Sequence, residues 1–377
     1  MQHPNTGPSR RLLLAGAAAL AAPGVASAAA SPGGLIDAFI RERMIAKGVP
    51  GAGVAVVRAG KVLKRAGYGR ASIEFDVAAS ERTVFPMASS SKMLAGLTAA
   101  RLVESGKLSF DASIRDYLPE VPVAWGAVHI WHLLSHTSGL GGPGGNPEYV
   151  AEAAKRKDEE TYVDPLKLES FTPAELIAYA AAAPVVGPPG EEWRYAQFPY
   201  FLFGEIVRRL TGGAYHDYVM REILTPLGMA DSHYGDHRTL VPGRNSTNYT
   251  RQFGPLQNFA LEYTPGYWTA AGLNASAADM VRFFDAFQPG RLVSQASLDR
   301  LFAPVVLGDG KPFLYGLGFD LNDAGGRQSA GHEGGGCCYV RWWPAERLGI
   351  AIMLNLSGSR EDGVELKLEE RLLEGSA

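Results

Sequence analysis

The feature that most constrains the fold is the presence of β-rich segments at both ends of the chain. Near the start, residues 52–58 and 61–68 flank Ala59-Gly60, which is typical of a hairpin. Near the end, strands are predicted at 315–321, 327–331, 337–343 and 348–355. The middle of the chain shows mainly helical spacing. This order predicts an α+β fold with one antiparallel sheet built from both chain ends, flanked by helices, and an inserted, mainly helical region.

Length and composition favour one large domain. The chain has 377 residues, of which 46% are hydrophobic, enough for a sizeable core. We expect one domain at 33–375, with an α/β part at about 33–115 and 256–375 and a helical part at about 116–255. Predicted helices lie at 33–47, 89–104, 173–183, 200–210, 215–224, 275–287 and 364–373. The formal net charge of −3, without a basic run, argues against a nucleic-acid partner.

The first 30 residues have the organisation of a secretory signal. Arg10-Arg11 precede an Ala/Leu/Gly-rich run that ends near Ala22, and Ala26-Ser27-Ala28 offers a cleavage site. We therefore predict a twin-arginine signal peptide at 1–30 and a bacterial protein that is periplasmic or secreted. Because the apolar run is too short to span a bilayer and no cysteine follows it, we expect no stable membrane anchor.

The chain contains two cysteines, Cys337 and Cys338, and they are adjacent. Two cysteines cannot form a disulfide framework, and a ring between neighbours is strained. We expect two small buried thiols, and the sequence leaves their redox state open.

Ser89 and Lys92 form the only Ser-x-x-Lys in the sequence. A separation of three residues places both side chains on one helical turn, where the hydroxyl can reach the amine. A serine needs a neighbouring base to become a nucleophile, and a buried lysine can act as that base because burial disfavours its charged form. The surrounding run is too apolar for a free surface helix, so this pair is the candidate nucleophile and base.

Two other segments could complete a site for acyl transfer. A Pro/Gly turn at 188–190 leads to Tyr195, which would present an aromatic hydroxyl from a loop just before a helix. Residues 331–336 place a glycine-rich turn at the end of a predicted strand, where backbone N–H groups can approach a ligand closely. Acyl transfer needs a second proton-transfer group and donors for an oxyanion, and these segments could supply both.

These motifs, in this order, resemble the serine β-lactamase-related family, which includes class C β-lactamases, D,D-peptidases, D-aminopeptidases and β-lactamase-fold esterases. The resemblance covers about residues 35–373. Its motifs are 85–92 for Ser-x-x-Lys, 132–140 for a helix-and-turn signature, 189–197 for the segment ending in Tyr-x-Asn, 226–229, 271–280, and 331–335 in the place of Lys-Thr-Gly.

The resemblance implies a role for each matching residue. Ser89 would be the nucleophile, Lys92 would assist its deprotonation, and Tyr195 would be a proton shuttle, expected as a phenolate stabilised by Lys92. The backbone N–H groups of Ser89 and Gly335 would form the oxyanion hole, with Gly334 beside it. The substrate-binding set is Gln197, His332, Gly334 and Gly335. No metal and no cofactor are implied.

The sequence departs from the family pattern at two positions. Gln197 stands where Tyr-x-Asn has asparagine, so its amide is one methylene further from the backbone. His332 stands where Lys-Thr-Gly has lysine, so a permanent positive charge for a β-lactam carboxylate is missing. Glu333 would add negative charge unless it points outward, and Arg341, on the following predicted strand, is the arginine that could compensate. Both departures weaken the β-lactamase interpretation.

We therefore predict an exported serine hydrolase that cleaves a small ester or amide through an acyl-enzyme on Ser89. A D,D-carboxypeptidase or D-aminopeptidase, or a weak β-lactamase, is the alternative within the class, with a short peptide as substrate. A catalytically silent binding or sensing domain of the same fold is the alternative of another class. The histidines His129, His132 and His136 share a helix face but have no carboxylate at matching spacing, so a metal site is not expected. The oligomeric state stays open.

Overall fold

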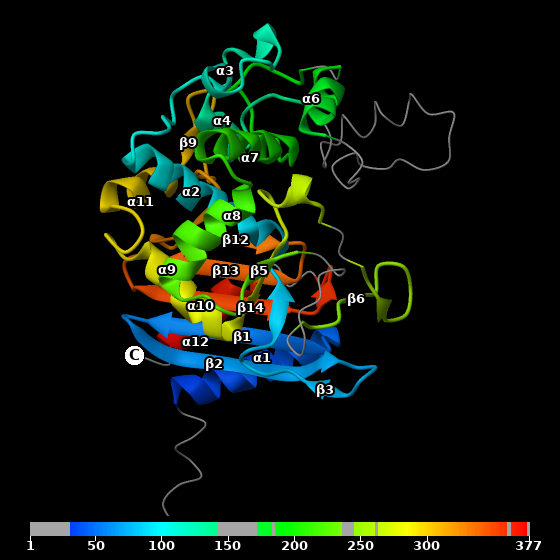
Figure 1. Cartoon of the computed structure of the whole chain (residues 1–377). Coiled ribbons are helices and arrows are strands. Elements are labelled where there is room, and N and C mark those ends of the chain that lie inside the picture. Colours follow the sequence, from blue (N-terminus) through cyan, green and yellow to red (C-terminus); the bar gives the residue numbers. More distant parts are fainter. Residues whose placement is uncertain are drawn as a thin grey trace, which may run out of the picture.

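The computed structural model describes residues 31–141, 172–182, 185–235, 245–260, 263–359 and 363–374. The predicted signal peptide at 1–30 lies outside these ranges. Within them, the main sheet has the strand order β11-β12-β13-β14-β1-β2-β3, so strands from both ends of the chain pair with one another (Figure 1). The predicted α+β fold, with a helical region inserted between the strands, is confirmed.

The helices of the described residues, including the short 3₁₀ and π turns, are α1 (Pro32–Lys47), η1 (Ala88–Ser91), α2 (Lys92–Glu104), α3 (Ile114–Tyr117), η2 (Val123–Trp125), α4 (Ile130–Leu134), α6 (Pro173–Ala181), α7 (Phe198–Thr211), α8 (Tyr215–Val219), η4 (Met220–Leu224), α9 (Thr225–Leu227), η5 (Pro265–Tyr267), α10 (Ala277–Phe283), η6 (Phe284–Phe287), α11 (Gln295–Leu301) and α12 (Val364–Glu374).

The strands are β1 (Gly51–Arg58), β2 (Lys61–Ser72), β3 (Val77–Ala78), β4 (Val84–Pro86), β5 (His233–Tyr234), β6 (Tyr249–Thr250), β7 (Gln257–Asn258), β8 (Leu273–Ser276), β9 (Val305–Val306), β10 (Pro312–Phe313), β11 (Asp320–Ala324), β12 (Arg327–Gly334), β13 (Cys338–Trp343), β14 (Leu348–Leu354) and β15 (Leu356–Ser357).

The two chain ends meet in the centre of the sheet. β1 pairs antiparallel with β14 along its length, and with β2 through the predicted Ala59-Gly60 turn. Both turn residues have positive φ, 48° for Ala59 and 79° for Gly60, as a tight two-residue hairpin requires. β1 is buried along almost its whole length, which fits a central strand covered on both faces.

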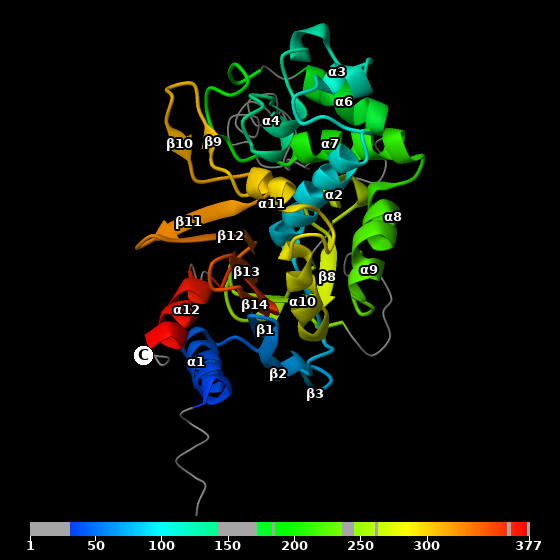
Figure 2. The same ribbon diagram turned by 90° about the vertical axis from the view of Figure 1, so that its left-hand side faces the viewer.

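One face of the sheet is covered by α1 and α12, which lie side by side in Figure 2. Ser31 caps α1 by accepting a hydrogen bond from the Gly34 N–H, and Ile36, Phe39 and Ile40 bury the inner side of the helix. These side chains share a cluster with Val54 and other residues of the sheet. The helix from one chain end thus packs on the helix from the other.

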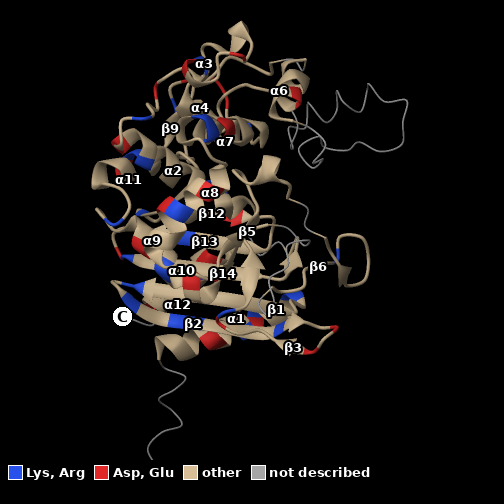
Figure 3. Cartoon of the chain, viewed as in Figure 1, with Lys and Arg blue, Asp and Glu red and all other residues tan. Residues whose placement is uncertain are grey.

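The opposite face carries α10 and leads to the helical region. In Figure 1, α2 lies between the sheet and the helices drawn above it, and the core on this side joins residues of all three parts. Figure 3 shows acidic and basic residues interspersed along the elements in view rather than separated by sign. No helix within the described ranges is long and apolar enough to cross a membrane.

The structure corrects two predicted elements. Residues 315–321 are not a strand before Asp320, because Gly316 and Gly318 bring this backbone into contact with neighbouring helices: a Cβ would lie 2.1 Å from the Leu301 carbonyl oxygen and 2.5 Å from that of Lys92, respectively. The helix predicted at 275–287 begins at Ala277, after Ser276 caps it, and continues from Phe284 as a 3₁₀ turn.

Candidate active site

The nucleophile candidate lies in a strained turn between a strand and a helix. β4 pairs with β8, and the chain then makes the 3₁₀ turn η1 before α2 begins at Lys92. Ser89 is therefore one turn before the α-helix rather than within it. Ala88, the residue before it, has a φ of 43°, a conformation that costs energy for any residue with a Cβ. Ser89 is partly exposed, so a substrate can reach its hydroxyl.

Lys92 is fully buried behind Ser89 and has three polar neighbours. Its Nζ lies 2.8 Å from Gln197 Oε1, 3.1 Å from the Ala270 carbonyl oxygen and 3.3 Å from Ser89 Oγ. Burial lowers the pKa of Lys92 well below its ordinary value. A neutral amine has two N–H bonds and one lone pair. Because the first two neighbours only accept, the hydrogens go to them and the lone pair faces Ser89, as a base requires.

Tyr195 reaches Ser89 from the other side. Its hydroxyl donates to Ser89 Oγ at 2.8 Å. Burial raises the pKa of Tyr195 to about 12, and the hydrogen bonds from Ser89 and Gln197 only partly offset this. The expected phenolate is therefore replaced by a phenol that donates to the nucleophile. Lys92 Nζ lies 4.8 Å from the centroid of the Tyr195 ring. Because both groups contact Ser89 Oγ, a proton can pass between them through the serine hydroxyl.

His136 holds the Tyr195 segment in place. Its carbonyl oxygen accepts from the Arg194 N–H at 2.8 Å, and its ring Nδ1 accepts from the Ala196 N–H at 3.2 Å. The ring lies against Tyr195 with 4.3 Å between centroids. Because Nδ1 accepts, the ring is neutral, and burial lowers the pKa of His136 well below its ordinary value. The sequence predicted a structural helix-and-turn motif at 132–140, and His136 of this motif contacts the segment that carries Tyr195.

Gln197 lies directly before α7 and reaches the site through a contact with Lys92. Although its side chain is longer than asparagine, its amide oxygen still accepts from Lys92 at 2.8 Å. The added methylene therefore does not remove the contact to the base. The longer side chain thus does not move the amide out of reach of Lys92.

The end of β12 touches the nucleophile turn directly. A Cβ on Gly334 would lie 2.2 Å from the Met87 carbonyl oxygen, so only glycine allows this approach. Ser90 Oγ donates to the His332 carbonyl oxygen at 2.9 Å, a second tie between strand and turn. Gly335 follows with a φ of 56° and is exposed beside Ala88. The turn at Gly335 therefore lies beside Ala88, the residue that precedes Ser89.

His332 is buried, and both of its ring nitrogens have partners. Nε2 lies 3.0 Å from the Tyr315 hydroxyl and Nδ1 lies 2.5 Å from the Glu333 carbonyl oxygen. Burial lowers the pKa of His332 to about 3. The ring therefore stays neutral at ordinary pH.

The charges near His332 lie on the other side of the strand. Glu333 pairs with Tyr339 across the strands, on the face that packs under α1 and α12. Arg341 is buried on that same face, with ion pairs to Glu365 and Asp320 at 3.0 and 3.1 Å. Arg341 therefore cannot compensate for the missing lysine.

The cysteines beside this turn are buried free thiols, as expected. Cys337 and Cys338 are both free, and burial raises the pKa of each thiol. Neither is a nucleophile at neutral pH.

The sequence did not identify two partners in this site. The Ala270 carbonyl holds Lys92, but a backbone carbonyl leaves no trace in a motif. Tyr315 binds His332 from a segment that was interpreted as a strand. Among the described residues, no cluster of side chains could hold a metal ion.

Comparison with known proteins gives this geometry a family. A model of the beta-lactamase family matches residues 36–374. The chain belongs to the beta-lactamase family. Esterase EstB of Burkholderia gladioli is 30% identical over 369 residues, covering 87% of this chain and 90% of that protein.

Solved structures share the fold of this beta-lactamase family member. The octameric penicillin-binding protein homologue from Pyrococcus abyssi has a TM-score of 0.76 at 24% identity, covering 90% of this chain and 77% of that one. The D-amino acid amidase of Ochrobactrum anthropi SV3 has a TM-score of 0.69 at 23% identity, covering 90% and 98%. As a member of this family the chain is a serine hydrolase.

Proposed function

We propose that the protein is an exported hydrolase of neutral carboxylic esters that works through an acyl-enzyme on Ser89. The observation that carries this proposal is His332. At the position where a cation would hold an anionic substrate, the chain has a buried neutral ring bound to Tyr315. A substrate carboxylate would find no ion-pair partner there, whereas a neutral ester needs none.

Acylation follows from the contacts around Ser89. Lys92 takes the proton of Ser89 as Oγ attacks the ester carbonyl carbon, and the N–H groups of Ser89 and Gly335 stabilise the oxyanion. Tyr195 donates its proton to the leaving alkoxide as the C–O bond breaks. The Lys92 ammonium then returns the proton to Tyr195, which leaves an ester on Ser89 and a free alcohol.

Deacylation uses the same groups with water. Water loses a proton to Lys92 as it attacks the acyl carbon, and Tyr195, whose hydroxyl lies 2.8 Å from Ser89 Oγ, donates a proton to that oxygen as it leaves. The carboxylic acid departs, and transfer of the proton from Lys92 to Tyr195 restores the resting site.

Esterase EstB is itself named an esterase, which supports this choice over peptidase or β-lactamase activity. The amidase among the solved structures keeps amides as the second candidate, since a D-amino acid amide also has no carboxylate at its reacting end. p-Nitrophenyl esters, D-amino acid amides and nitrocefin compared at equal concentration would separate these activities. We expect the esters to be turned over fastest.

Labelling with a fluorophosphonate tests the nucleophile. Mass spectrometry should place the adduct on Ser89, and Ser89→Ala should lose both labelling and turnover, while Ser138→Ala serves as the matched control and keeps both. Tyr195→Phe should slow hydrolysis of ethyl esters more than that of p-nitrophenyl esters, because nitrophenolate leaves without a proton. Fast nitrocefin hydrolysis, or a fully active Ser89→Ala variant, would exclude the proposed function.

A further inference from the structure

Two aromatic side chains, Trp193 and Phe313, lie beside Tyr195 of the candidate active site. Trp193 is two positions before Tyr195 in the loop that leads to α7, and the centroids of the two rings are 6.1 Å apart. Phe313 belongs to the β9–β10 hairpin, and its ring stacks on Trp193 with 4.7 Å between centroids and 21° between planes. The Gly308 N–H of this hairpin donates to the Glu191 carbonyl oxygen, a second contact between hairpin and loop. We call Trp193 and Phe313 the aromatic platform.

The aromatic platform is accessible to a substrate, unlike the other described rings around Tyr195. The His136 and His332 rings lie 4.3 and 6.4 Å from the Tyr195 ring, and Lys92 Nζ lies 4.8 Å from its centroid. These three side chains are buried, whereas both residues of the platform and Tyr195 itself are partly exposed. Of the described rings around Tyr195, the platform is therefore the one that a bound group can contact.

Packing alone gives no reason for an indole at position 193. Trp125 and Phe198 show the arrangement of a core pair, with edge-to-face rings that are 4% and 0% exposed. Trp193 instead keeps part of its ring exposed, and its indole N–H is buried with no acceptor among the described residues. A phenylalanine in this place would avoid the cost of that unpaired donor.

The proposed chemistry directs the leaving group of the substrate to this platform. The Tyr195 hydroxyl lies 2.8 Å from Ser89 Oγ and protonates the leaving alkoxide, so the alcohol oxygen must lie at this hydroxyl. The carbon atoms of the alcohol continue from that oxygen past the Tyr195 side chain. Because Lys92 and His136 are buried against the ring, the accessible direction leads to Trp193.

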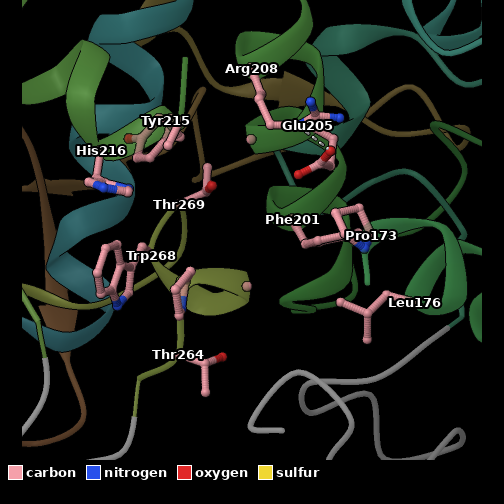
Figure 4. A pocket seen from close by; sticks show the side chains of 14 residues that line it. Pro173, Leu176, Phe201, Glu205, Arg208, Tyr215, His216, Thr264, Trp268 and Thr269 are labelled. Atoms are coloured by element: carbon pink, nitrogen blue, oxygen red, sulfur yellow. Dashed lines mark hydrogen bonds and ion pairs between the residues drawn. The ribbon is translucent and has the colours of Figure 1, made fainter. Parts of the chain in front are cut away.

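A pocket of about 400 Å³ between α7 and α8 is not an alternative place for this group. Figure 4 shows Trp268 and His216 on one side of the pocket and Phe201 on the other. Neither Ser89 nor a side chain that contacts Ser89 Oγ lines this pocket.

The charges near the platform favour a neutral ring. Glu192 and Arg194 form an ion pair with 2.6 Å between their atoms, so these two charges offset one another. Glu191 lies beside Gly308 and is exposed, which adds negative charge at the edge of the platform. An anionic leaving group would be repelled there, whereas a neutral aromatic ring can stack on the indole.

We propose that the aromatic platform binds the ring of the alcohol part of the substrate, so that the protein prefers esters of arylalkyl alcohols to esters of small aliphatic alcohols. This inference rests on the proposed ester hydrolysis at Ser89 and adds the class of the leaving group. Trp193 supplies the face on which the ring stacks, and Phe313 holds Trp193 in place.

A set of butyrate esters tests the platform in the purified protein. The rate constant kcat/KM is measured for 2-phenylethyl, 2-cyclohexylethyl and ethyl butyrate. The three alcohols differ little in acidity, so the ratios of the rates report how the alcohol group binds rather than how easily it leaves. In the unmodified protein the 2-phenylethyl ester should be hydrolysed fastest.

Variants of the platform should change the ratio of the 2-phenylethyl rate to the ethyl rate. We expect Trp193→Ala to lower this ratio by about tenfold, and Trp193→Phe to retain most of it because a ring remains for stacking. Phe313→Ala should lower the ratio by about threefold, since Trp193 then loses its support. Phe253→Ala is the matched control, because Phe253 is 74% exposed on the turn between β6 and β7, and its ratio should not change.

Transfer of the butyryl group to an alcohol gives a second readout if Trp193→Ala folds poorly. In the reverse of acylation the alcohol attacks the acyl-enzyme from the place where the leaving group departs. 2-Phenylethanol should therefore compete with water better than ethanol does at equal concentration. The ratio of 2-phenylethyl butyrate to butyrate formed from p-nitrophenyl butyrate measures this competition, and Phe313→Ala should lower it while Phe253→Ala should not.

Three results would overturn the platform. The first is an unchanged ratio in a folded Trp193→Ala variant, and the second is an equal loss for all three esters, because Trp193 would then act only by positioning Tyr195. The third is an equal rate for the phenyl and cyclohexyl esters in the unmodified protein, which would exclude aromatic stacking. Full ester turnover by Ser89→Ala would instead overturn the proposed function, so the two failures are distinguishable.

Discussion

At the scale of single residues, Lys92 is the position where activity and stability conflict. In the folded protein burial lowers its pKa, whereas in the unfolded chain the amine has its ordinary value of 10.5. Between the lowered pKa of the folded protein and 10.5, the unfolded state therefore binds up to one proton more than the folded state, and this difference destabilises the fold. The buried base that the reaction needs therefore lowers the free energy of unfolding.

We predict that Lys92→Met abolishes turnover but stabilises the fold at pH 7. The gain comes from removing the buried amine and should shrink as the pH rises toward 10.5, because the unfolded lysine then also loses its proton. Where the folded amine is neutral and the unfolded one charged, the slope is about 1.4 kcal/mol per pH unit. Urea unfolding at pH 7, 8 and 9 measures it, with exposed Lys311→Met as control.

A stability difference that does not change between pH 7 and 9 would mean that Lys92 carries its proton in the folded protein. The lone pair could then not face Ser89, and another group would have to act as base. A difference that grows with pH would have the wrong sign for a buried neutral amine.

The chemistry of the site could be predicted from sequence at the residues that occur in motifs, and the structure places Lys92 and Tyr195 at Ser89 Oγ, with Gln197 bound to Lys92. The protonation states could not be predicted from sequence, since they depend on burial. A histidine in a motif can be exposed and titrate, or be buried as His332 is, and the sequence is the same in both cases. The contact of Lys92 with Ala270 joins residues far apart in the chain and involves only a carbonyl.

At the scale of elements, the contact between β12 and η1 sets the oxyanion geometry. Gly334 permits the strand to lie against the Met87 carbonyl, and the chain then turns at Gly335. A methyl group at position 334 has no room unless the strand or the nucleophile turn moves. Such a movement would shift the Gly335 N–H relative to that of Ser89.

We predict that Gly334→Ala lowers kcat by about 100-fold or more while the protein stays folded, since misplacing one oxyanion donor costs on that order. Gly213→Ala is the matched control, because a Cβ there meets no atom within 4 Å and the residue does not have positive φ. Steady-state kinetics with p-nitrophenyl butyrate, alongside circular dichroism of each variant, measures the effect. An active Gly334→Ala variant would remove the Gly335 N–H from the oxyanion hole.

The elements themselves were predicted where local pattern decides them. The hairpin at Ala59-Gly60 is such a local feature, and it occurs as predicted. The strand predicted at 315–321 was wrong. The apolar alternation of these residues resembles a strand, but contacts of Gly316 and Gly318 with α11 and α2 shape the backbone. Those contacts are tertiary and have no periodic signal.

At the scale of the whole molecule, the site depends on elements from both chain ends. β12 reaches Ser89 through a sheet whose centre pairs β1 with β14, and α1 and α12 cover its far face. The order of strands at both ends and helices between them was enough to predict this arrangement.

The start of α1 ties the proposed export to the fold. The described chain begins at Ser31, whose hydroxyl accepts from the Gly34 N–H at 3.1 Å and caps the helix. A leader cleaved shortly after Ala28 would leave this cap intact, whereas cleavage beyond Pro32 would remove it. Loss of a serine cap costs about 1 kcal/mol.

We predict that replacing Arg10-Arg11 with Lys-Lys keeps the full-length precursor in the cytoplasm, and that the exported protein begins between Ala29 and Ser31. Cell fractionation and mass spectrometry of the N-terminus measure both outcomes. In urea unfolding, a protein beginning at Ala29 should be about 1 kcal/mol more stable than the same protein with Ser31→Ala, because the first turn of α1 then lacks an acceptor for its N–H groups. An exported protein that still begins at Met1, or one that begins after Pro32 with undiminished stability, would contradict this account of the leader.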